Sequence, residues 1–262
     1  MTARLKDEVA IVTGAGRGFG RSIALRLARE GAAVTITART PSQVEQVVGE
    51  IQAAGGRALG VAGDVTQAPD VARIVRLASE RFGDATLLVN NAGVPGPFGP
   101  VWETDIESWW ASQALHIKAP MLFLRQVLPA MVARRAGRVI IVSAIAARRV
   151  APYLSAYCVG KLAQTRIIEE VAAETKELGV AAFAIDPGFV FTGIAADTMN
   201  SPDAQRWLPG MVGRLREKQA AADSHADLQR CAQRCADLAS GRYDALSGRY
   251  LELGDDLEAL LR

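Results

Sequence analysis

The sequence predicts an α/β fold in which a doubly wound, parallel, seven-stranded sheet forms a single domain over residues 1–262. Short apolar runs rich in β-branched residues alternate with helical patterns along most of the chain. The runs are almost continuously apolar, which is typical of parallel strands that helices cover on both faces. A chain of 262 residues is long enough for one such domain with a full core.

The first unit is a strand, a glycine turn and a helix. The apolar run Val9–Thr13 stops abruptly, glycines follow at positions 14, 16, 18 and 20, and residues 21–28 are apolar at helical spacing. At such a turn free backbone N–H groups and the positive end of the helix dipole converge, and no Cβ blocks a phosphate. The turn therefore predicts an anion site. The alternative is that these glycines only let the strand and the helix pack closely.

The remaining elements continue the alternation. We expect strands over 33–38, 58–62, 86–90, 138–143, 180–185 and 249–253, with the last at an edge of the sheet. We expect helices that begin at Pro41 and Pro69, a long helix over 105–135 disturbed at Pro120, and a helix over 155–178. This order is that of a Rossmann-like sheet, in which ligands bind at the carboxyl ends of the strands.

The segment of residues 189–224 interrupts this alternation. It follows the carboxyl end of the strand expected over 180–185, so we interpret it as a lid over the substrate; the alternative is a surface elaboration. The large apolar residues of the lid and of the long helix favour an apolar small-molecule substrate, and they also suit a core or a subunit interface. They are Phe189, Phe191, Ile194, Met199, Trp207, Leu208 and Met211, with Trp109 and Trp110.

Composition and charge argue against several other classes of protein. The net charge is +2 and no basic block occurs, so we expect no nucleic-acid partner. No apolar run is long enough to span a bilayer and the N-terminus lacks the apolar core of a signal peptide, so we expect a cytoplasmic protein with no membrane partner. Cys231 and Cys235 have no histidine or acidic cluster to complete a metal site, which favours reduced thiols and no metal.

Four motifs occur along the chain in the order and at the distances of one enzyme family. They are T-G-x-x-x-G-x-G at 13–20, N-N-A-G at 90–93, Y-x-x-x-K at 157–161 and P-G-x-x-x-T at 187–192. With these motifs the chain resembles the short-chain dehydrogenase/reductase family over about residues 5–255. The resemblance implies an oxidoreductase that uses a nicotinamide cofactor.

The resemblance also implies which residues hold this cofactor. The glycine turn would hold the pyrophosphate, residues 64–65 would meet the adenine, residues 91–93 would approach a ribose, and residues 187–192 would bracket the nicotinamide. The full set is Gly14, Gly16, Arg17, Gly18, Phe19, Gly20, Arg39, Asp64, Val65, Asn91, Ala92, Gly93, Tyr157, Lys161, Pro187, Gly188, Val190 and Thr192.

The end of the second strand bears on the form of the cofactor. An acidic residue there would bond the ribose 2′-hydroxyl of NAD, whereas a basic residue accommodates the 2′-phosphate of NADP. This chain has Arg39 and no carboxylate there, and Arg17 of the glycine turn could join it in binding a phosphate. The pattern favours NADP(H) over NAD(H). The alternative is that both arginines are solvated surface residues.

Tyr157 and Lys161 are the candidate acid–base pair. Four residues apart, they share one face of a helix. A tyrosine in water has a pKa of about 10, and a neighbouring ammonium group lowers it because it favours the phenolate. The pair therefore predicts proton transfer while the cofactor carries the hydride. We expect an NADP-dependent oxidoreductase that interconverts a secondary alcohol and a ketone, with reduction favoured.

Two positions depart from the pattern of the family. Its catalytic serine lies thirteen residues before the tyrosine, where this chain has Ala144. Ser143 could replace it only if the backbone twists, because consecutive residues of a strand point to opposite sides. His116 stands at the position of the family's asparagine, where it either relays protons or is only hydrogen-bonded within the helix. The remaining candidates for the missing hydroxyl are Tyr153, Ser155 and residues of the lid.

These departures leave a second function open. The chain could be a nucleotide-binding relative with lost or redirected redox activity, which would act as a scaffold or regulator or would reduce an imine or an activated double bond. Retention of both Tyr157 and Lys161 favours the enzyme. The resemblance further implies a homodimer or homotetramer formed through the long helices and the last strand, although residues 247–256 lack the D-G-G that often closes the family.

Overall fold

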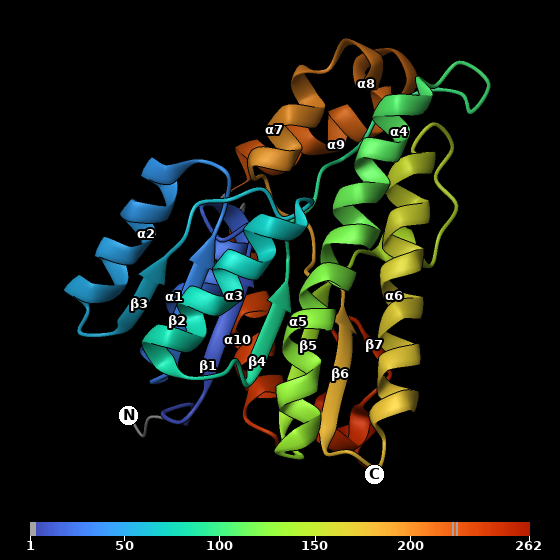
Figure 1. The fold of residues 1–262 in the computed structure, drawn as a ribbon. Coiled ribbons are helices and arrows are strands. Elements are labelled where there is room, and N and C mark those ends of the chain that lie inside the picture. The colour runs from blue at the N-terminus through green and yellow to red at the C-terminus, as the bar shows by residue number, and fades with distance from the viewer. Residues whose placement is uncertain (1–3, 222, 224) are drawn as a thin grey trace.

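One sheet of seven parallel strands organises the chain, with helices on both of its faces (Figure 1). The computed structural model describes residues 4–221, 223 and 225–262. The spatial order of the strands is β3-β2-β1-β4-β5-β6-β7, so the winding reverses between β1 and β4, where ligands of such sheets bind. The predicted doubly wound sheet is confirmed. The strands are β1 (Val9–Thr13), β2 (Ala33–Thr37), β3 (Arg57–Gly60), β4 (Leu87–Asn90), β5 (Gly137–Val142), β6 (Val180–Ile185) and β7 (Tyr250–Leu251).

Two layers of helices and a cap of shorter helices surround the sheet (Figure 1). The helices beside the sheet are α1 (Gly18–Arg29), α2 (Pro41–Ala53), α3 (Ala68–Phe82), α4 (Ile106–Gln113), α5 (Ala119–Ala133), α6 (Ser155–Thr175) and α10 (Ala226–Ala239). The cap consists of α7 (Gly193–Asn200), α8 (Pro202–Trp207) and α9 (Pro209–Ala220), and α11 (Leu257–Leu260) lies near the end of the chain. Single turns lie at Ile145–Ala147 and Asp244–Leu246.

Alternating side chains of each strand fill two separate cores. Val12 and Ile36 belong to the core beneath α1, α2 and α10, whereas Ile11 and Leu88 belong to the core beneath α3, α5 and α6. All four side chains are fully buried. Because both faces are covered, nearly every strand position can be apolar, which is the pattern that the sequence shows.

The long helix expected over 105–135 is two helices joined by a π-helical turn, Ala114–Lys118. The disturbance therefore precedes Pro120, which is the second residue of α5. Proline has no N–H to donate to the carbonyl four residues earlier, which is that of His116. The hydrogen bonds here span five residues instead of four, and the N–H of Ala119 donates to the carbonyl of Ala114.

Several other boundaries differ from those predicted, most of them by a single residue. The third strand covers Arg57–Gly60 rather than 58–62, the helix after β5 ends at Thr175 rather than 178, and β7 is only two residues long, although it is an edge strand as expected. The lid segment of residues 189–224 forms α7, α8 and α9, which lie above the carboxyl ends of the strands (Figure 1). Residues 222 and 224 of this segment lie outside the described residues.

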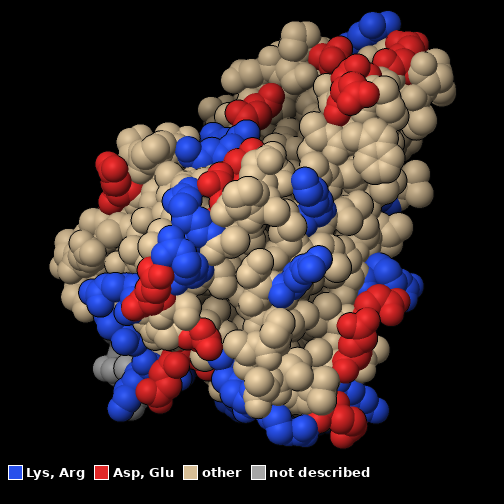
Figure 2. Space-filling model, in the orientation of Figure 1, with Lys and Arg blue, Asp and Glu red and all other residues tan. Residues whose placement is uncertain are grey.

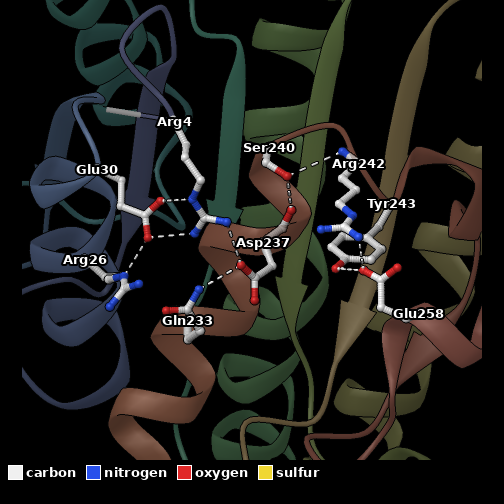
Figure 3. Close-up of polar contacts among 9 residues, drawn as sticks. All are labelled: Arg4, Arg26, Glu30, Gln233, Asp237, Ser240, Arg242, Tyr243 and Glu258. Carbon is white, nitrogen blue, oxygen red and sulfur yellow. Dashed lines mark hydrogen bonds and ion pairs between the residues drawn. The ribbon is translucent and has the colours of Figure 1, made fainter. Parts of the chain in front are cut away.

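Polar contacts tie α1 and α10 to the two ends of the described chain (Figure 3). Glu30 at the end of α1 accepts hydrogen bonds from Arg4 and Arg26, and Arg4 also donates to Asp237 on α10. The paired arginine holds the pKa of the Glu30 carboxyl below its ordinary value. Just after the C-terminal end of α10, Tyr243 donates to Glu258 on α11. These contacts fix the helix that covers one face of the sheet.

Acidic and basic residues are interspersed on the face shown in Figure 2, and uncharged surface lies between them. The chain's formal net charge is +2. Among the described residues, no helix is both long enough and apolar enough to cross a membrane.

Candidate active site

A cleft of about 900 Å³ opens at the carboxyl ends of the strands. It brings together most of the residues that the motifs predict for the cofactor, namely Gly14, Gly16, Arg17, Gly18, Phe19, Arg39, Asp64, Val65, Asn91, Ala92, Gly93 and Thr192. Pro187 and Val190 are instead buried in the segment between β6 and α7. The structure thus gathers residues from the glycine turn and from the ends of β2, β3 and β4 around one hollow.

Thr13 and Asn91 hold the glycine turn against the end of β4. The Asn91 side-chain amide donates to the carbonyl of Thr13 at 2.9 Å and to that of Gly14 at 3.2 Å. In return, the Thr13 hydroxyl oxygen accepts from the backbone N–H groups of Asn91 and Ala92. A Cβ on Gly14 would lie 2.9 Å from the Ala92 Cα, and the φ of Gly14 is +63°. Close packing therefore explains this glycine.

Close packing also explains the glycine at position 20. A Cβ there would lie 2.4 Å from both the Gly14 carbonyl oxygen and the Asn91 side-chain nitrogen. Gly18 is different, because a Cβ would find its nearest neighbour, Thr192, at 3.5 Å, while its φ of +58° favours glycine. Both interpretations made from the sequence therefore apply to this turn. Gly14 and Gly20 permit close packing, whereas Gly18 leaves space beside the backbone at the start of α1.

The N-terminus of α1 faces this cleft without a cap. No side chain of the described residues caps it, and its first turn contains no acidic residue. The first N–H groups of a helix have no partner within it, and the helix dipole adds positive potential there. The residues present therefore fit a pyrophosphate group of a dinucleotide, which would take hydrogen bonds from the turn at 16–20.

Arg17 and Arg39 both line the cleft, but their surroundings differ. Arg39 is exposed at the end of β2. The Arg17 guanidinium lies 3.0 Å from the Asp197 carboxylate on α7, and it covers Gly193, where a Cβ would lie 2.2 Å from the Arg17 Cζ. Arg17 is thus engaged with the lid, whereas Arg39 lies at the rim. Exposed pairs of this kind contribute little to stability, so a stronger anion can displace the carboxylate.

Asp64 occupies the cleft wall beyond β3. One oxygen of its carboxylate accepts from the backbone N–H and the hydroxyl of Thr66, and its own N–H donates to Asp70. Val65 beside it is buried, with 5% of its surface exposed. These bonds fix the loop where the sequence predicts contact with the adenine.

Tyr157 and Lys161 lie together on the first turns of α6. The Lys161 Nζ lies 5.6 Å from the centre of the Tyr157 ring, and Lys161 is only 4% exposed. Burial, and secondly the Asp186 carboxylate, raises the pKa of the Tyr157 phenol above its ordinary value of 10. Burial also lowers the pKa of Lys161 to about 7, against a smaller opposing effect of Asp186. The phenol is therefore protonated at neutral pH, and the amine can gain or lose a proton there.

His116 packs edge-on against the Tyr157 ring, with the ring centres 5.7 Å apart. Its Nε2 lies 2.9 Å from the Val94 carbonyl oxygen, so we assign the proton to Nε2, since a carbonyl only accepts. Burial and the Lys161 charge lower the pKa of His116 to about 3. The imidazole is thus neutral, and its Nδ1 is a buried acceptor with no hydrogen-bond partner among the described residues. His116 is therefore better suited to accept a hydrogen bond at a fixed position than to relay protons by titrating near neutral pH.

These features agree with comparisons to known proteins. Residues 8–203 match the short chain dehydrogenase family. The chain belongs to that family. A short chain dehydrogenase of Pseudocercospora fijiensis is 33% identical over 264 residues, which cover 98% of this chain and 84% of that protein. A 2-(S)-hydroxypropyl-CoM dehydrogenase of Xanthobacter autotrophicus is 32% identical over 221 residues, which cover 82% of this chain and 86% of that protein.

The short-chain dehydrogenase fold also matches solved structures. A 7α-hydroxysteroid dehydrogenase complexed with NADH and 7-oxo glycochenodeoxycholic acid superimposes with a TM-score of 0.82 at 25% identity, over 96% of this chain and 94% of that one. Short-chain dehydrogenases are oxidoreductases that bind a nicotinamide cofactor. The uncapped turn and the cleft are therefore suited to NAD(H) or NADP(H).

Ser143 does not replace the hydroxyl that this short-chain dehydrogenase lacks at Ala144. The Ser143 hydroxyl donates to the Lys161 carbonyl at 3.1 Å and lies 3.4 Å from the Thr165 hydroxyl, and Ser143 is 1% exposed. The side chain keeps the alternating direction of the strand and points to the backbone of α6. The backbone twist that would turn Ser143 towards the position of the Ala144 side chain is therefore not present.

The two other named candidates for the hydroxyl are also engaged. The Ser155 oxygen accepts from the indole N–H of Trp109 at 3.2 Å. Tyr153 has a φ of +68°, and its ring packs on Trp207 of α8 with the ring centres 5.2 Å apart. Tyr153 therefore joins the loop before α6 to the lid.

Sequence reasoning missed two polar residues of this site, Gln164 and Asp186. The Gln164 side-chain oxygen accepts from the Lys161 Nζ at 3.1 Å, and the Asp186 carboxyl, whose pKa burial raises, follows β6 directly. Their positions carried a usable signal. Gln164 lies one turn after Lys161 on the same helix face, and Asp186 precedes the Pro187-Gly188 motif.

Gly160 lets α6 pack against the π-helical turn that carries His116. A Cβ at position 160 would lie 2.7 Å from the His116 Cβ and 2.8 Å from its Cγ. We expect Gly160→Ala to lower the free energy of unfolding by about 1–3 kcal/mol, because the added methyl must push the two helices apart. Urea unfolding measures this effect.

Gly49 provides the matched control. It lies within α2, and a Cβ there would find nothing within 4 Å. We expect Gly49→Ala to stabilise the chain by about 0.5–1 kcal/mol, because alanine has the higher helix propensity. Equal effects of the two substitutions would show that the contact with His116 costs nothing.

Proposed function

We propose that this chain is an NADP-dependent oxidoreductase that interconverts a secondary alcohol and a ketone and acts mainly as a reductase. The observation that carries the proposal is the pair formed by the half-buried Tyr157 and the buried Lys161 near the carboxyl ends of the strands, next to the cofactor cleft. The high pKa of Tyr157 supports the direction, since a protonated phenol is the general acid that reduction needs.

A nicotinamide cofactor held by the turn at residues 16–20 and the cleft would supply the hydride that the carbonyl carbon accepts. The Tyr157 hydroxyl donates its proton to the carbonyl oxygen, which becomes the alcohol oxygen. The Lys161 ammonium group stabilises the phenolate that forms and can return a proton to it, because its pKa is about 7. The neutral His116, whose Nδ1 has no hydrogen-bond partner among the described residues, can accept a hydrogen bond from a water or another donor.

The lid supports an apolar substrate in the proposed reaction. Phe189 and Ile194 are exposed at its start, and the stacked rings of Tyr153 and Trp207 connect α8 to the loop before α6. A closed lid of apolar side chains would exclude water from the hydride transfer and would strengthen its electrostatic interactions. We therefore expect bulky apolar ketones to be better substrates than small hydrophilic ones.

A panel of ketones with NADPH tests the function. Purified protein should oxidise NADPH in the presence of at least one bulky apolar ketone, at a rate that the protein alone does not show. The same panel should include an imine and an activated enone, because the missing hydroxyl at Ala144 favours a redirected reduction as the second candidate function. Turnover of only the imine or enone would select that second candidate.

The preference for NADP rests on Arg39. We expect Arg39→Asp to weaken NADPH binding by about 10- to 100-fold, because a charge-assisted hydrogen bond to the 2′-phosphate is lost. NADH binding should change much less. Fluorescence titration with each cofactor measures both affinities.

Arg81→Asp is the control for this change of charge. Arg81 lies in the last turn of α3, which leads to the amino end of β4, whereas the cleft opens at the carboxyl ends of the strands, and Arg81 does not line it. It should leave both affinities as in the wild-type protein. An equal loss of NADPH and NADH affinity in Arg39→Asp would contradict the preference for NADP.

The proposed assembly is a homodimer or homotetramer. Met121 on α5 and Val159 and Leu162 on α6 are exposed apolar side chains on the long helices, and such surface is what a subunit interface covers. Light scattering coupled to size-exclusion chromatography measures the mass. The cytoplasmic location and an absence of nucleic-acid partners stay predictions.

A further inference from the structure

Gln164 contacts the candidate catalytic lysine directly. It lies on α6, one turn after Lys161, and its Oε1 accepts from the Lys161 Nζ at 3.1 Å. The Val142 carbonyl at the end of β5 accepts from the same Nζ at 2.8 Å. Gln164 is 1% exposed and Lys161 is 4% exposed. Polar side chains that are buried to this degree normally have a hydrogen-bond partner, and for Gln164 that partner is Lys161.

Counting donors shows what this arrangement leaves for catalysis. A lysine ammonium group has three N–H donors. Gln164 and Val142 take two of them. The third is left for the side where Gly93 and Tyr157 lie: Nζ is 3.7 Å from the position of a Cβ on Gly93, and 5.6 Å from the centre of the Tyr157 ring.

We propose that Gln164 is a positioning residue that fixes the Lys161 amine, through the bond from Nζ to Oε1, so that one N–H donor faces Tyr157 and the cofactor cleft. The inference deepens the proposed function and rests on it. Lysine has four rotatable side-chain bonds, and without this acceptor its end would sample several rotamers. A fixed amine keeps the reacting geometry within the narrow range that catalysis needs.

The neutral charge of Gln164 is as important as its position. The charged or titratable groups that face Lys161 are Asp186 at the end of β6, His116 on the π-helical turn and Tyr157 on α6. His116 is neutral, and Asp186 only partly offsets burial. A carboxylate at position 164 would hold the lysine charged. The amide orients it and still lets it exchange a proton near neutral pH.

Titration of Lys161 by NMR tests this role without any turnover. The protein is labelled with ¹³Cε-lysine, and Lys161→Met assigns the signal among those of Lys6, Lys118, Lys176 and Lys218. In the wild-type protein we expect Lys161 to titrate at about 7. Gln164→Glu should raise this pKa by about one unit or more, because it places an opposite charge at hydrogen-bond distance.

Gln52→Glu is the matched control. Gln52 is exposed on α2, so the same substitution adds the same charge outside the site. It should leave the Lys161 titration unchanged. Equal Lys161 pKa values in the wild-type protein and Gln164→Glu would overturn the proposal, since they would show that position 164 does not contact the amine.

Kinetics then separate positioning from structural support. We expect Gln164→Leu to lower kcat by about tenfold, because the substitution removes one hydrogen bond to a charged group. NADPH affinity should stay within about twofold of wild type. In Gln164→Glu the pH profile of kcat should shift in the alkaline direction with the Lys161 pKa. An unchanged kcat in Gln164→Leu with an unshifted profile in Gln164→Glu would overturn the proposal. If no ketone is reduced by the wild-type protein, the proposed function fails, while the NMR titration still decides whether Gln164 sets the state of Lys161.

Discussion

Replacing Tyr157 with phenylalanine is expected to lower kcat for NADPH-dependent ketone reduction by about 10³-fold, because the reaction loses its general acid. The substitution removes one oxygen and keeps the ring that packs against His116. NADPH affinity and the free energy of unfolding should therefore stay close to the wild-type values. Steady-state kinetics, fluorescence titration and urea unfolding measure the three quantities.

Tyr250→Phe is the control for this substitution. Tyr250 on β7 is another tyrosine whose phenol pKa burial raises, and its hydroxyl has no hydrogen-bond partner among the described residues. We expect full activity from this variant. Wild-type activity in Tyr157→Phe would contradict the acid–base role of Tyr157, and equal losses in both variants would point to a general electrostatic effect of the phenols.

The second large effect is expected for Lys161→Met. Methionine keeps much of the length of the buried side chain and removes its charge, so the phenolate that forms on Tyr157 loses its electrostatic partner. We expect kcat/KM to fall by about 100-fold, because the transition state loses the stabilisation that one charge-assisted hydrogen bond provides. Lys176→Met, at the exposed end of α6, should retain wild-type kinetics.

Lys161→Met should also change how stability depends on pH. The pKa of Lys161 is about 7 in the folded chain and 10.5 for an ordinary lysine. Between these values the unfolded chain binds more protons, so this residue adds stability as the pH rises above 7. Methionine does not titrate, and the variant should lack this gain. Urea unfolding at about pH 6 and about pH 9 measures it. Parallel behaviour of the two proteins would show that the lysine is not buried as described.

Much of the fold could be predicted because its signals are local. The apolar run at 9–13, the glycine turn and the run at 180–185 each contain enough β-branched or apolar residues to mark an element by themselves. The boundaries that failed depend on other parts of the chain. The π-helical turn before Pro120 forms where two helices meet α6 at Gly160, and the extent of β7 is set by where it pairs with β6.

The candidate site was predictable only where residue type implies chemistry. Tyr157, Lys161 and Asn91 stand in recognisable motifs, so their convergence could be expected. Three-dimensional packing decides the rest. Whether Ser143 faces the cleft or α6 depends on the strand's last peptide, and the pairing of Arg17 with the lid joins segments far apart in sequence. Neither contact leaves a pattern in the sequence.

The transfer of deuterium from NADPH to the product tests the proposed reaction most directly. The wild-type protein is incubated with a reducible ketone and NADPH that carries deuterium at both C4 positions of the nicotinamide, and the product is analysed by mass spectrometry. We expect a secondary alcohol with deuterium at the carbinol carbon from the wild-type protein, and no alcohol above background from Tyr157→Phe. Equal yields of deuterated alcohol from both proteins, or an alcohol without deuterium, would contradict hydride transfer assisted by Tyr157.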